Sequence, residues 1–562
     1  MPGYNVANAL RGHATERPGA IAIKFPARSY TTATPTWDAW TFAQLDQQSD
    51  AYARGFAAAG ITAGDRTTVL FRPSLELYAV LFALFKLGAV PVLLDPGMGL
   101  RPVLACIERT RPRVVIAMPV VHAVRTFARR PFASAEILIT VGRRWFWGGT
   151  TLAACDQPGP EPFPIVSCDA ADDAAILFTS GSTGSAKGVA SKQAMFAAQV
   201  EALRQMFDLE PGQIDQQAFA AFAIFDICLG MTSVIPKMDL SRPATARPED
   251  IVAAIQANAP DVAFASPIVW QNTTRYCQQT NTRLDPLQTV LTVGAPIPAD
   301  LHRRFMELLP TGAQVYTPYG ATEGMPISWI GSEEILGDSD SDSDSEGTWS
   351  QTARGWGTCV GRIAPGAWVR IIEIHDDPIP TWSDELALPS GQLGEIVVGG
   401  DQVSPEYKDV PEANVEAKIT DGARVLHRMG DLGYLDADDR LWFCGRKAHR
   451  LQTTAGIVPP VPVEGIYNED PDVFRTALVG VGPVGAEVPV LCVEMEPGNV
   501  YGPHVEARLR ALGQGTRYEG LVKRFLPHPG FPTDARHNSK IRREDLKPWA
   551  EARCGDLVKP AP

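Results

Sequence analysis

The chain has 562 residues, of which 45% are hydrophobic and 20% are charged, and its formal net charge is -13 at pH 7. This length exceeds that of one typical core and predicts at least two domains. The excess of acidic residues argues against a nucleic-acid partner, because proteins that neutralise phosphates usually present a basic face.

The cysteines and the apolar runs indicate the cellular compartment that we expect for this protein. Nine cysteines are scattered through the chain and none forms a CxxC pair, which favours a reduced, cytoplasmic compartment and argues against a zinc site. The first 19 residues include charges and lack the apolar core of a secretory signal. The most apolar run, residues 77–94, is interrupted by Lys86, Gly88 and Pro91. We therefore expect a helix, a turn and a buried strand there, and no transmembrane segment.

Short apolar runs alternate with helical patterns along the first two thirds of the chain. Residues 67–71 predict a strand, residues 75–87 a helix, and residues 90–94 a second strand. A polar helix follows, and further strands are predicted at residues 114–117, 137–141, 174–178, 262–265, 290–293 and 314–316. Strands and helices in this order are typical of an α/β protein with parallel sheets covered by helices.

Two changes in composition divide the rest of the chain. Residues 337–347, GDSDSDSDSEG, are acidic and of low complexity, which predicts a disordered surface insertion without a function of its own. Near residue 440 an apolar strand gives way to a basic, polar connection, which indicates a hinge. We expect a large domain over residues 1–444 and a smaller α/β domain over residues 445–562. In the latter, strands are predicted at residues 476–481 and 488–494, and a helix at residues 505–512.

The stretch at residues 177–189, LFTSGSTGSAKGV, has the composition of an anion-binding loop. A strand that ends at Phe178, a flexible polar loop and a helix over about residues 192–207 would present N–H groups and hydroxyls to a phosphate. A surface turn is the simpler alternative. A P-loop is excluded, because its GxxxxGK[ST] pattern fails at Ala186 and Gly188. The predicted phosphate-binding residues are Thr179, Ser180, Gly181, Ser182, Thr183, Gly184 and Lys187.

This loop resembles the signature of the adenylate-forming superfamily of acyl-CoA synthetases, adenylation domains and luciferases. Further matching segments follow in the family's order: TVGAP at residues 292–296, YTPYGATEG at 316–324, MGDLGYLDADDRLWFCGRK at 429–447 and ARHNSKIRREDL at 535–546. Ala186 stands where proline is common and Met429 where threonine is frequent. The resemblance implies a large N-terminal domain and a smaller, mobile C-terminal lid domain that carries a catalytic lysine.

The resemblance also implies ATP and Mg²⁺ as cofactors and gives roles to individual residues. Thr322 would contact the α-phosphate and Glu323 would bind Mg²⁺, which agrees with the preference of this hard cation for oxygen ligands. Lys540 would bridge the acid and the α-phosphate and stabilise the charge of the transition state. The other implied nucleotide contacts are Tyr319 and Gly320 at the adenine, Gly294, Ala295 and Pro296 as the purine wall, Asp431 at the ribose hydroxyls, and Arg446 at ribose or phosphate.

The implied first reaction joins a carboxylic acid to AMP, and the acceptor of the acyl group is the open question. Ala448 stands where most relatives have an Asp or Lys at the pivot of the C-terminal domain. Residues 220–239 lack the histidine of many acyl-CoA ligases and, with HNSKI and PVEGIYNEDPDV, are more similar to the β-lactone synthetases of bacterial olefin biosynthesis. In that group the 3-hydroxyl of a long-chain 2-alkyl-3-hydroxy acid attacks its own activated carboxyl.

This resemblance favours β-lactone formation and leaves two alternatives. One is a long-chain fatty acyl-CoA ligase, and the other is an inactive nucleotide-binding protein that serves as an assembly partner. The olefin pathway suggests, by analogy, that other pathway enzymes are partners. Phe222, Phe225 and Trp270 are candidate walls of the acyl pocket, although each of them fits a core position equally well.

Overall fold

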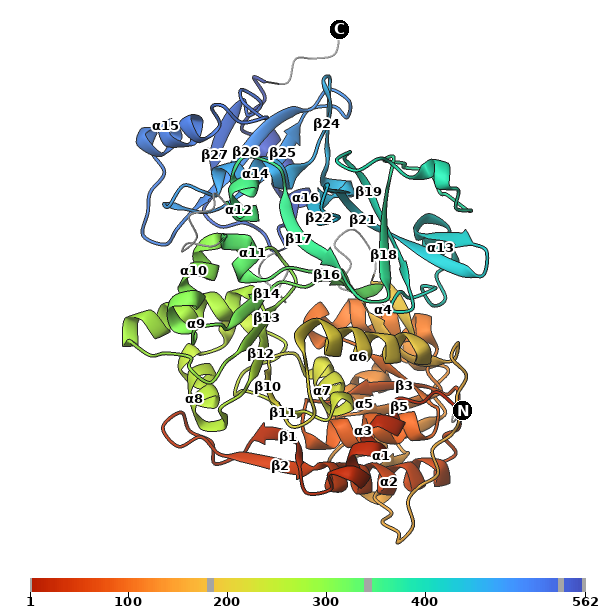
Figure 1. Cartoon of the computed structure of the whole chain (residues 1–562). Helices are drawn as coiled ribbons and strands as arrows, with labels where there is room; N and C mark the ends of the chain where they lie inside the picture. Colours follow the sequence, from red (N-terminus) through yellow and green to blue (C-terminus); the bar gives the residue numbers. More distant parts are fainter. Residues whose placement is uncertain (1–2, 179–185, 338–345, 534–539, 558–562) are drawn as a thin grey trace.

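The computed structural model describes residues 3–178, 186–337, 346–533 and 540–557 (Figure 1). The predicted phosphate-loop residues Thr179, Ser180, Gly181, Ser182, Thr183 and Gly184 lie outside this set, as does most of the acidic segment predicted at residues 337–347. Three sheets form the large domain, and the C-terminal region forms a further sheet of its own. The chain therefore has the predicted α/β architecture.

The first sheet has seven strands in the order β7-β6-β5-β3-β4-β8-β9, and all but β9 run parallel to their neighbours. Its strands are β3 (Arg66–Leu70), β4 (Val90–Leu93), β5 (Val114–Ala117), β6 (Ile137–Thr140), β7 (Thr150–Thr151), β8 (Asp173–Phe178) and β9 (Gly188–Lys192). Its helices are α1 (Ala7–Glu16), α2 (Phe42–Ala58), α3 (Leu75–Lys86), α4 (Leu100–Thr110) and α5 (Pro119–Phe127). Helix α3 packs with Val114 and Ile116, whereas α4 and α5 pack with Val115 and Ala117. Because successive strand residues point to opposite faces, α4 and α5 share one face of this sheet and α3 covers the other.

The second sheet also has seven strands, in the order β14-β13-β12-β10-β11-β1-β2, and only β2 is antiparallel to its neighbour. Its strands are β1 (Ile21–Pro26), β2 (Trp37–Thr41), β10 (Ile214–Gln217), β11 (Thr232–Val234), β12 (Val262–Ala265), β13 (Thr289–Thr292) and β14 (Gln314–Tyr316). The helices in this part of the chain are α6 (Gln193–Phe207), α7 (Ala223–Leu229), α8 (Pro248–Asn258), α9 (Pro267–Thr280) and α10 (Ala299–Leu308).

The third sheet has eight strands and is antiparallel throughout. Its strands are β15 (Tyr319–Ala321), β16 (Gly324–Trp329), β17 (Thr358–Ile363), β18 (Ala367–Ile372), β19 (Gly394–Gly400), β20 (Lys418–Asp421), β21 (Arg424–Leu435) and β22 (Leu441–Arg446). Three short helices accompany it: α11 (Ser332–Leu336), α12 (Thr348–Ala353) and α13 (Pro411–Ala417). The sequence pattern did not predict this sheet.

The C-terminal region lies at one end of the molecule, in blue in Figure 1. Its elements are the hairpin β23 (Leu451–Thr453) and β24 (Gly456–Val458), the sheet of β25 (Val473–Val481), β26 (Val488–Met495) and β27 (Arg524–Pro527), and the helices α14 (Pro460–Tyr467), α15 (Pro503–Leu512) and α16 (Arg543–Glu551). Strand β22 ends at Arg446, so the boundary expected after residue 444 falls inside the last strand of the large domain. An ion pair of 3.0 Å joins Arg275 of α9 to Glu496, and Trp349 donates a 2.9 Å hydrogen bond to Glu469.

The structure corrects one expectation about the phosphate loop. Strand β9 intervenes between the loop and α6, and it pairs antiparallel with β8 from Phe178↔Gly188 to Asp173↔Lys192. Val189 and Ala190 are fully buried, which is why these residues extend the sheet instead of starting the helix. The loop thus joins two paired strands, and α6 begins only after Lys192.

Candidate active site

A cavity of about 3840 Å³ lies between the large domain and the C-terminal region. It exceeds the roughly 300–1,000 Å³ of an ordinary ligand pocket, so a nucleotide and a second substrate both fit. It lies at the carboxyl ends of β13 and β14, where α/β proteins usually bind their ligands. Of the predicted site residues within the described part, the cavity is lined by Lys187, Phe222, Phe225, Gly294, Ala295, Pro296, Tyr319, Gly320, Thr322, Glu323, Asp431, Arg446 and Lys540.

Asp431 on β21 is the centre of a hydrogen-bonded triad at this cavity. The Tyr319 hydroxyl donates to Asp431 Oδ2 at 2.6 Å, and Arg446 Nη1 donates to Asp431 Oδ1 at 2.8 Å. Asp431 and Arg446 are direct partners in the β21–β22 register, so the sheet itself sets this pair. Burial, together with the neighbouring Asp431 charge, raises the pKa of the Tyr319 phenol well above its usual range. Because a carboxylate has about four acceptor sites, Asp431 can still accept hydrogen bonds from ribose hydroxyls.

Glu323 lies in the tight turn between β15 and β16, where Ala321 pairs with Gly324. Its carboxylate Oε1 accepts a 2.7 Å hydrogen bond from the Tyr407 hydroxyl. The ammonium groups of Lys187 and Lys418 lie 5.0 Å and 5.3 Å from the centre of the Tyr407 ring. Tyr407 and Lys418 were missed in the sequence, because each is more than 80 residues from Glu323 and no motif marks it.

The surroundings of Glu323 fit Mg²⁺ only in combination with a phosphate ligand. No group of three or more His, Cys, Asp or Glu side chains that could hold a metal ion occurs among the described residues. Mg²⁺ commonly binds through one or two carboxylates, waters and substrate phosphates. Glu323 with the adjacent Thr322 hydroxyl would supply such a partial set of oxygen ligands, and the nucleotide would complete it.

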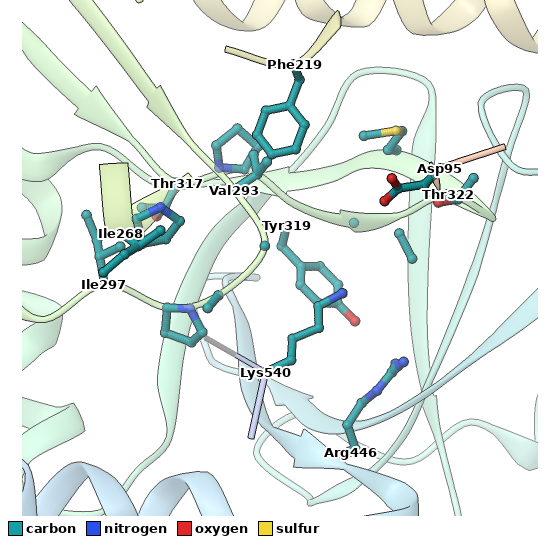
Figure 2. A pocket seen from close by; sticks show the side chains of 18 of the residues that line it. Asp95, Phe219, Ile268, Val293, Ile297, Thr317, Tyr319, Thr322, Arg446 and Lys540 are labelled. Carbon is teal, nitrogen blue, oxygen red and sulfur yellow. The ribbon is translucent and has the colours of Figure 1, made fainter. Parts of the chain in front are cut away.

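Lys540 enters the cavity from the C-terminal region and extends toward Tyr319 (Figure 2). It lies just before α16, and the start of this helix is held by a buried ion pair. Arg543 Nη2 lies 2.6 Å and 2.7 Å from the two carboxylate oxygens of Glu464. Glu464 Oε1 also accepts the backbone N–H of Leu478 at 2.7 Å. This network ties the segment that carries Lys540 to α14 and β25.

Aromatic side chains form part of the wall of the cavity, among them two of the three candidates for the acyl pocket. The Phe225 ring stacks on Phe196 at 4.7 Å between ring centres, and Phe222 stacks on Phe264 at 4.9 Å. The third candidate, Trp270, is fully buried and does not line the cavity. Its Nε1 donates to the Leu291 carbonyl at 3.3 Å and its ring packs against Phe305. Trp270 is therefore a core residue between α9, α10 and β13, and its assignment to the acyl pocket was wrong.

Two buried carboxyl groups, Asp215 on β10 and Asp226 on α7, also line the cavity. Ser233 Oγ donates to Asp226 Oδ2 at 2.6 Å, and Gln217 Nε2 donates to Asp215 Oδ2 at 3.1 Å. Burial raises the pKa of Asp226 to about 7 and that of Asp215 well above its ordinary range. The proximity of the two groups further disfavours a second negative charge. Burial and this proximity both favour the protonated form of the pair.

One cavity of this α/β fold thus collects the Asp431 triad, Glu323 and a lysine from the C-terminal region, the arrangement expected of a nucleotide-dependent enzyme. Residues 10–408 match the family model described as AMP-binding enzyme. This match covers more than half of the chain, which belongs to the AMP-binding enzyme family. The chain is accordingly an ATP-dependent, AMP-forming enzyme.

Two curated relatives match nearly the whole chain. The chain is 44% identical over 559 residues, 98% of both proteins, to the olefin beta-lactone synthetase of Stenotrophomonas maltophilia. It is 43% identical over 555 residues, 97% of both, to the olefin beta-lactone synthetase of Xanthomonas campestris.

Solved structures show the same fold at low sequence identity. An amide bond synthetase from Marinactinospora thermotolerans matches with a TM-score of 0.76 and 21% identity, over 97% of this chain and 99% of that chain. The O-succinylbenzoate coenzyme A synthetase of Bacillus subtilis, solved in complex with ATP and a magnesium ion, matches with a TM-score of 0.72 and 19% identity, over 97% of this chain and 99% of the other.

Proposed function

We propose that this enzyme converts a long-chain 2-alkyl-3-hydroxy acid into a β-lactone, with ATP cleaved to AMP and pyrophosphate. The observation that carries the proposal is the 43–44% identity, over 97% or more of the chain, to two olefin beta-lactone synthetases. The cavity supports it, because it joins a nucleotide-type site to an aromatic wall at Phe222 and Phe225. Apolar walls of this kind are suited to an acyl chain.

In the first step a carboxylate oxygen of the acid attacks the α-phosphorus of ATP, and the bond to pyrophosphate breaks. Asp431, held by Tyr319 and Arg446, would bind the ribose. Glu323 and Thr322 would hold Mg²⁺, which neutralises charge on the phosphates. Lys540 would lie between the acid and the α-phosphate, where its ammonium offsets the negative charge that both reacting groups contribute.

In the second step the 3-hydroxyl oxygen attacks the acyl carbon of the adenylate. The bond between this carbon and the AMP oxygen breaks, the hydroxyl proton passes to solvent, and a four-membered lactone forms. The nucleophile and the electrophile belong to one molecule, so the enzyme has to hold the chain in a folded conformation and needs no second substrate.

Mass spectrometry of the products tests this proposal directly. The protein is incubated with MgATP and a synthetic long-chain 2-alkyl-3-hydroxy acid, with and without coenzyme A. We expect a product at the mass of the acid minus water, together with AMP, in both reactions. A thioester that forms only with coenzyme A would show an acyl-CoA ligase instead. Absence of AMP under all conditions would show a protein that binds nucleotide without turning it over.

A further inference from the structure

One segment of this acidic protein is strongly basic. Residues 97–147 contain nine arginines, two glutamates, and no lysine or aspartate, a net charge of +7 in a chain that carries -13 overall. The rest of the chain therefore carries -20. Six of the nine arginines are exposed: Arg101, Arg111, Arg129, Arg130, Arg143 and Arg144. The exposed arginines lie on or next to α4 and α5, which cover the same face of the first sheet, and in the segment after β6.

Large apolar side chains are exposed in the same segment. Phe127 at the end of α5 is 89% exposed, Phe146 is 75% exposed, and Trp145 is 58% exposed. Val120, two helical turns before Phe127 on α5, is exposed as well. Large exposed apolar side chains are unfavourable in water, and their concentration in one segment indicates a surface that binds something.

The buried Trp147 holds the exposed Trp145 and Phe146 in place. Trp147 stacks on His122 of α5 at 5.8 Å between ring centres, and its Nε1 donates to Thr140 Oγ1 at 3.0 Å. Its carbonyl accepts a 3.2 Å hydrogen bond from Arg125 Nη2, also of α5. Trp145 and Phe146 lie 5.3 Å and 5.4 Å from this ring. They are thus fixed beside α5.

The neighbouring helix α4 links this surface to the active site. Arg101, Pro102 and Ala105 of α4, with Met98 just before it, line the cavity, whereas Leu100 is exposed. Helix α4 therefore lines the cavity near its start, and near its end Glu108 contacts Arg130 of the neighbouring basic segment at 2.7 Å.

We propose that this arginine–aromatic surface, made of Phe127, Arg129, Arg130, Arg143, Arg144, Trp145 and Phe146, binds the surface of an anionic lipid bilayer. Guanidinium groups match lipid phosphates in geometry and charge. Trp and Phe insert their rings at the boundary between headgroups and acyl chains. The large negative charge on the rest of the chain would orient this face toward the bilayer. Contact would be peripheral, because no helix in the described ranges is long and apolar enough to cross a membrane.

An acidic protein would also attract the arginines, but charge alone explains neither the exposed Trp nor the two exposed Phe side chains. A lipid surface uses both features at once, since the partition energy is the sum of an electrostatic and an apolar contribution. The binding surface stands on these observations alone. Its use for the uptake of a long-chain acid from the bilayer rests on the proposed function.

Co-sedimentation with vesicles tests the surface without substrate or ATP. We expect the protein to sediment with vesicles of phosphatidylcholine that contain phosphatidylglycerol, and to remain in solution with pure phosphatidylcholine. Binding should weaken as salt concentration rises, because exposed charges are screened. No sedimentation with the anionic vesicles would overturn the proposal. This holds even if the protein makes the lactone, so a failure of the lipid-binding proposal is distinguishable from a failure of the proposed function.

Two variants separate the charged and the apolar contributions. Arg143→Glu with Arg144→Glu should weaken partition at least about tenfold, since each basic residue near an anionic surface contributes about 1 kcal/mol. Trp145→Ala with Phe146→Ala should also weaken it, while Trp147 keeps the loop in place. Arg28→Glu with Arg362→Glu changes the net charge equally at exposed sites outside the segment, and Val484→Ser with Val500→Ser removes exposed apolar groups elsewhere. Both controls should bind like the wild type.

Pyrophosphate release with a short, freely soluble hydroxy acid should be unchanged in every variant, which shows that the fold and the site are intact. Vesicle binding that survives in both surface variants would overturn the assignment of this surface. If the wild type does not bind vesicles but binds an acidic protein through these residues, the partner is a protein and the lipid proposal is wrong.

Discussion

The Tyr407 hydroxyl donates a 2.7 Å hydrogen bond to Glu323 Oε1, which makes Tyr407 the positioning residue for the carboxylate expected to bind Mg²⁺. Its ring lies against the ammonium groups of Lys187 and Lys418, and burial lowers the pKa of Lys418 to about 7. One tyrosine thus connects the predicted metal ligand to two nearby ammonium groups, of which that of Lys187 belongs to a residue lining the cavity.

Tyr407→Phe removes the hydrogen bond and leaves the ring in place. Because a bond to a charged group contributes about 1.5–3 kcal/mol, we expect pyrophosphate release to fall about tenfold or more. We also expect half-saturation at a higher Mg²⁺ concentration, since Glu323 loses its orientation. A Mg²⁺ titration of ATP–pyrophosphate exchange measures both effects. If the Mg²⁺ dependence matches that of the wild type, Tyr407 has only a packing role.

Lys540→Ala should suppress formation of the acyl adenylate by about 10²–10³-fold, the cost of losing one preorganised charge in a transition state. ATP binding, measured by calorimetry, should remain, because the Asp431 triad is untouched. Lys523→Ala is the matched control, since this lysine of the same domain is exposed and its ammonium donates to the carbonyl of Gly520, three residues away. Near-normal pyrophosphate release by Lys540→Ala would remove the lysine from the mechanism.

The buried pair of Asp215 and Asp226 predicts a stability that falls as pH rises. The ordinary pKa of an aspartate is 3.8, and burial raises that of Asp226 to about 7. Between these values the native state holds a proton that the unfolded chain has released, so each step up in pH favours unfolding. Asp226→Asn stays neutral and should flatten this dependence.

Thermal unfolding between about pH 5 and pH 8 measures this effect. The fall in the melting temperature should be smaller in Asp226→Asn than in the wild type. It should be unchanged in Asp38→Asn, which alters an exposed carboxyl group. Parallel curves for all three proteins would show that the pair does not hold a proton.

Several parallel strands were predictable because they are short runs rich in buried apolar residues, whereas the parallel strand β10, with the polar sequence IDQQ, was not predicted. β5, β12 and β14 have the predicted bounds of residues 114–117, 262–265 and 314–316. The antiparallel sheet was missed because its strands contain buried charges. In β21, for example, Arg428 bonds to Glu395 at 2.7 Å, and a register shift between Leu432 and Gly433 interrupts the alternation. A pattern of alternating hydrophobicity cannot reveal such a strand.

Candidate site residues in motifs were predictable, whereas those that only the fold brings together were not. Tyr319, Asp431 and Arg446 lie in matching segments, and the structure brings them together at one cavity, where Tyr319 and Arg446 both donate to Asp431. Tyr407 reaches Glu323 because Gly324 forms a bridge with Val403, a contact between distant parts of the chain. Trp270 was misassigned because a core aromatic and a pocket aromatic look alike in sequence.

The connection between the domains predicts that lactone formation needs no rotation of the C-terminal region. Ala448 lies between two anchors: Lys447 Nζ donates to the His375 carbonyl at 2.6 Å, and Arg450 Nη2 contacts both oxygens of Asp376 at 2.8 Å and 2.6 Å. Both anchors tie the segment to the large domain. Ala448→Pro restricts φ at this position, and we expect both pyrophosphate release and lactone yield to stay within about twofold of the wild type, which a mass-spectrometric time course measures.

The opposite result has a distinct signature. If a rotation about this segment is required between the two steps, Ala448→Pro should release pyrophosphate normally and accumulate the acyl adenylate without forming the lactone. Ala448→Gly is the matched control, because it frees the backbone at the same position and should leave both steps unchanged if no rotation occurs. In the proposed reaction the 3-hydroxyl attacks the acyl carbon of the same molecule, so no incoming thiol would have to be admitted. An alanine at position 448, where most relatives have an Asp or Lys at the pivot, is then the expected consequence of an intramolecular second step.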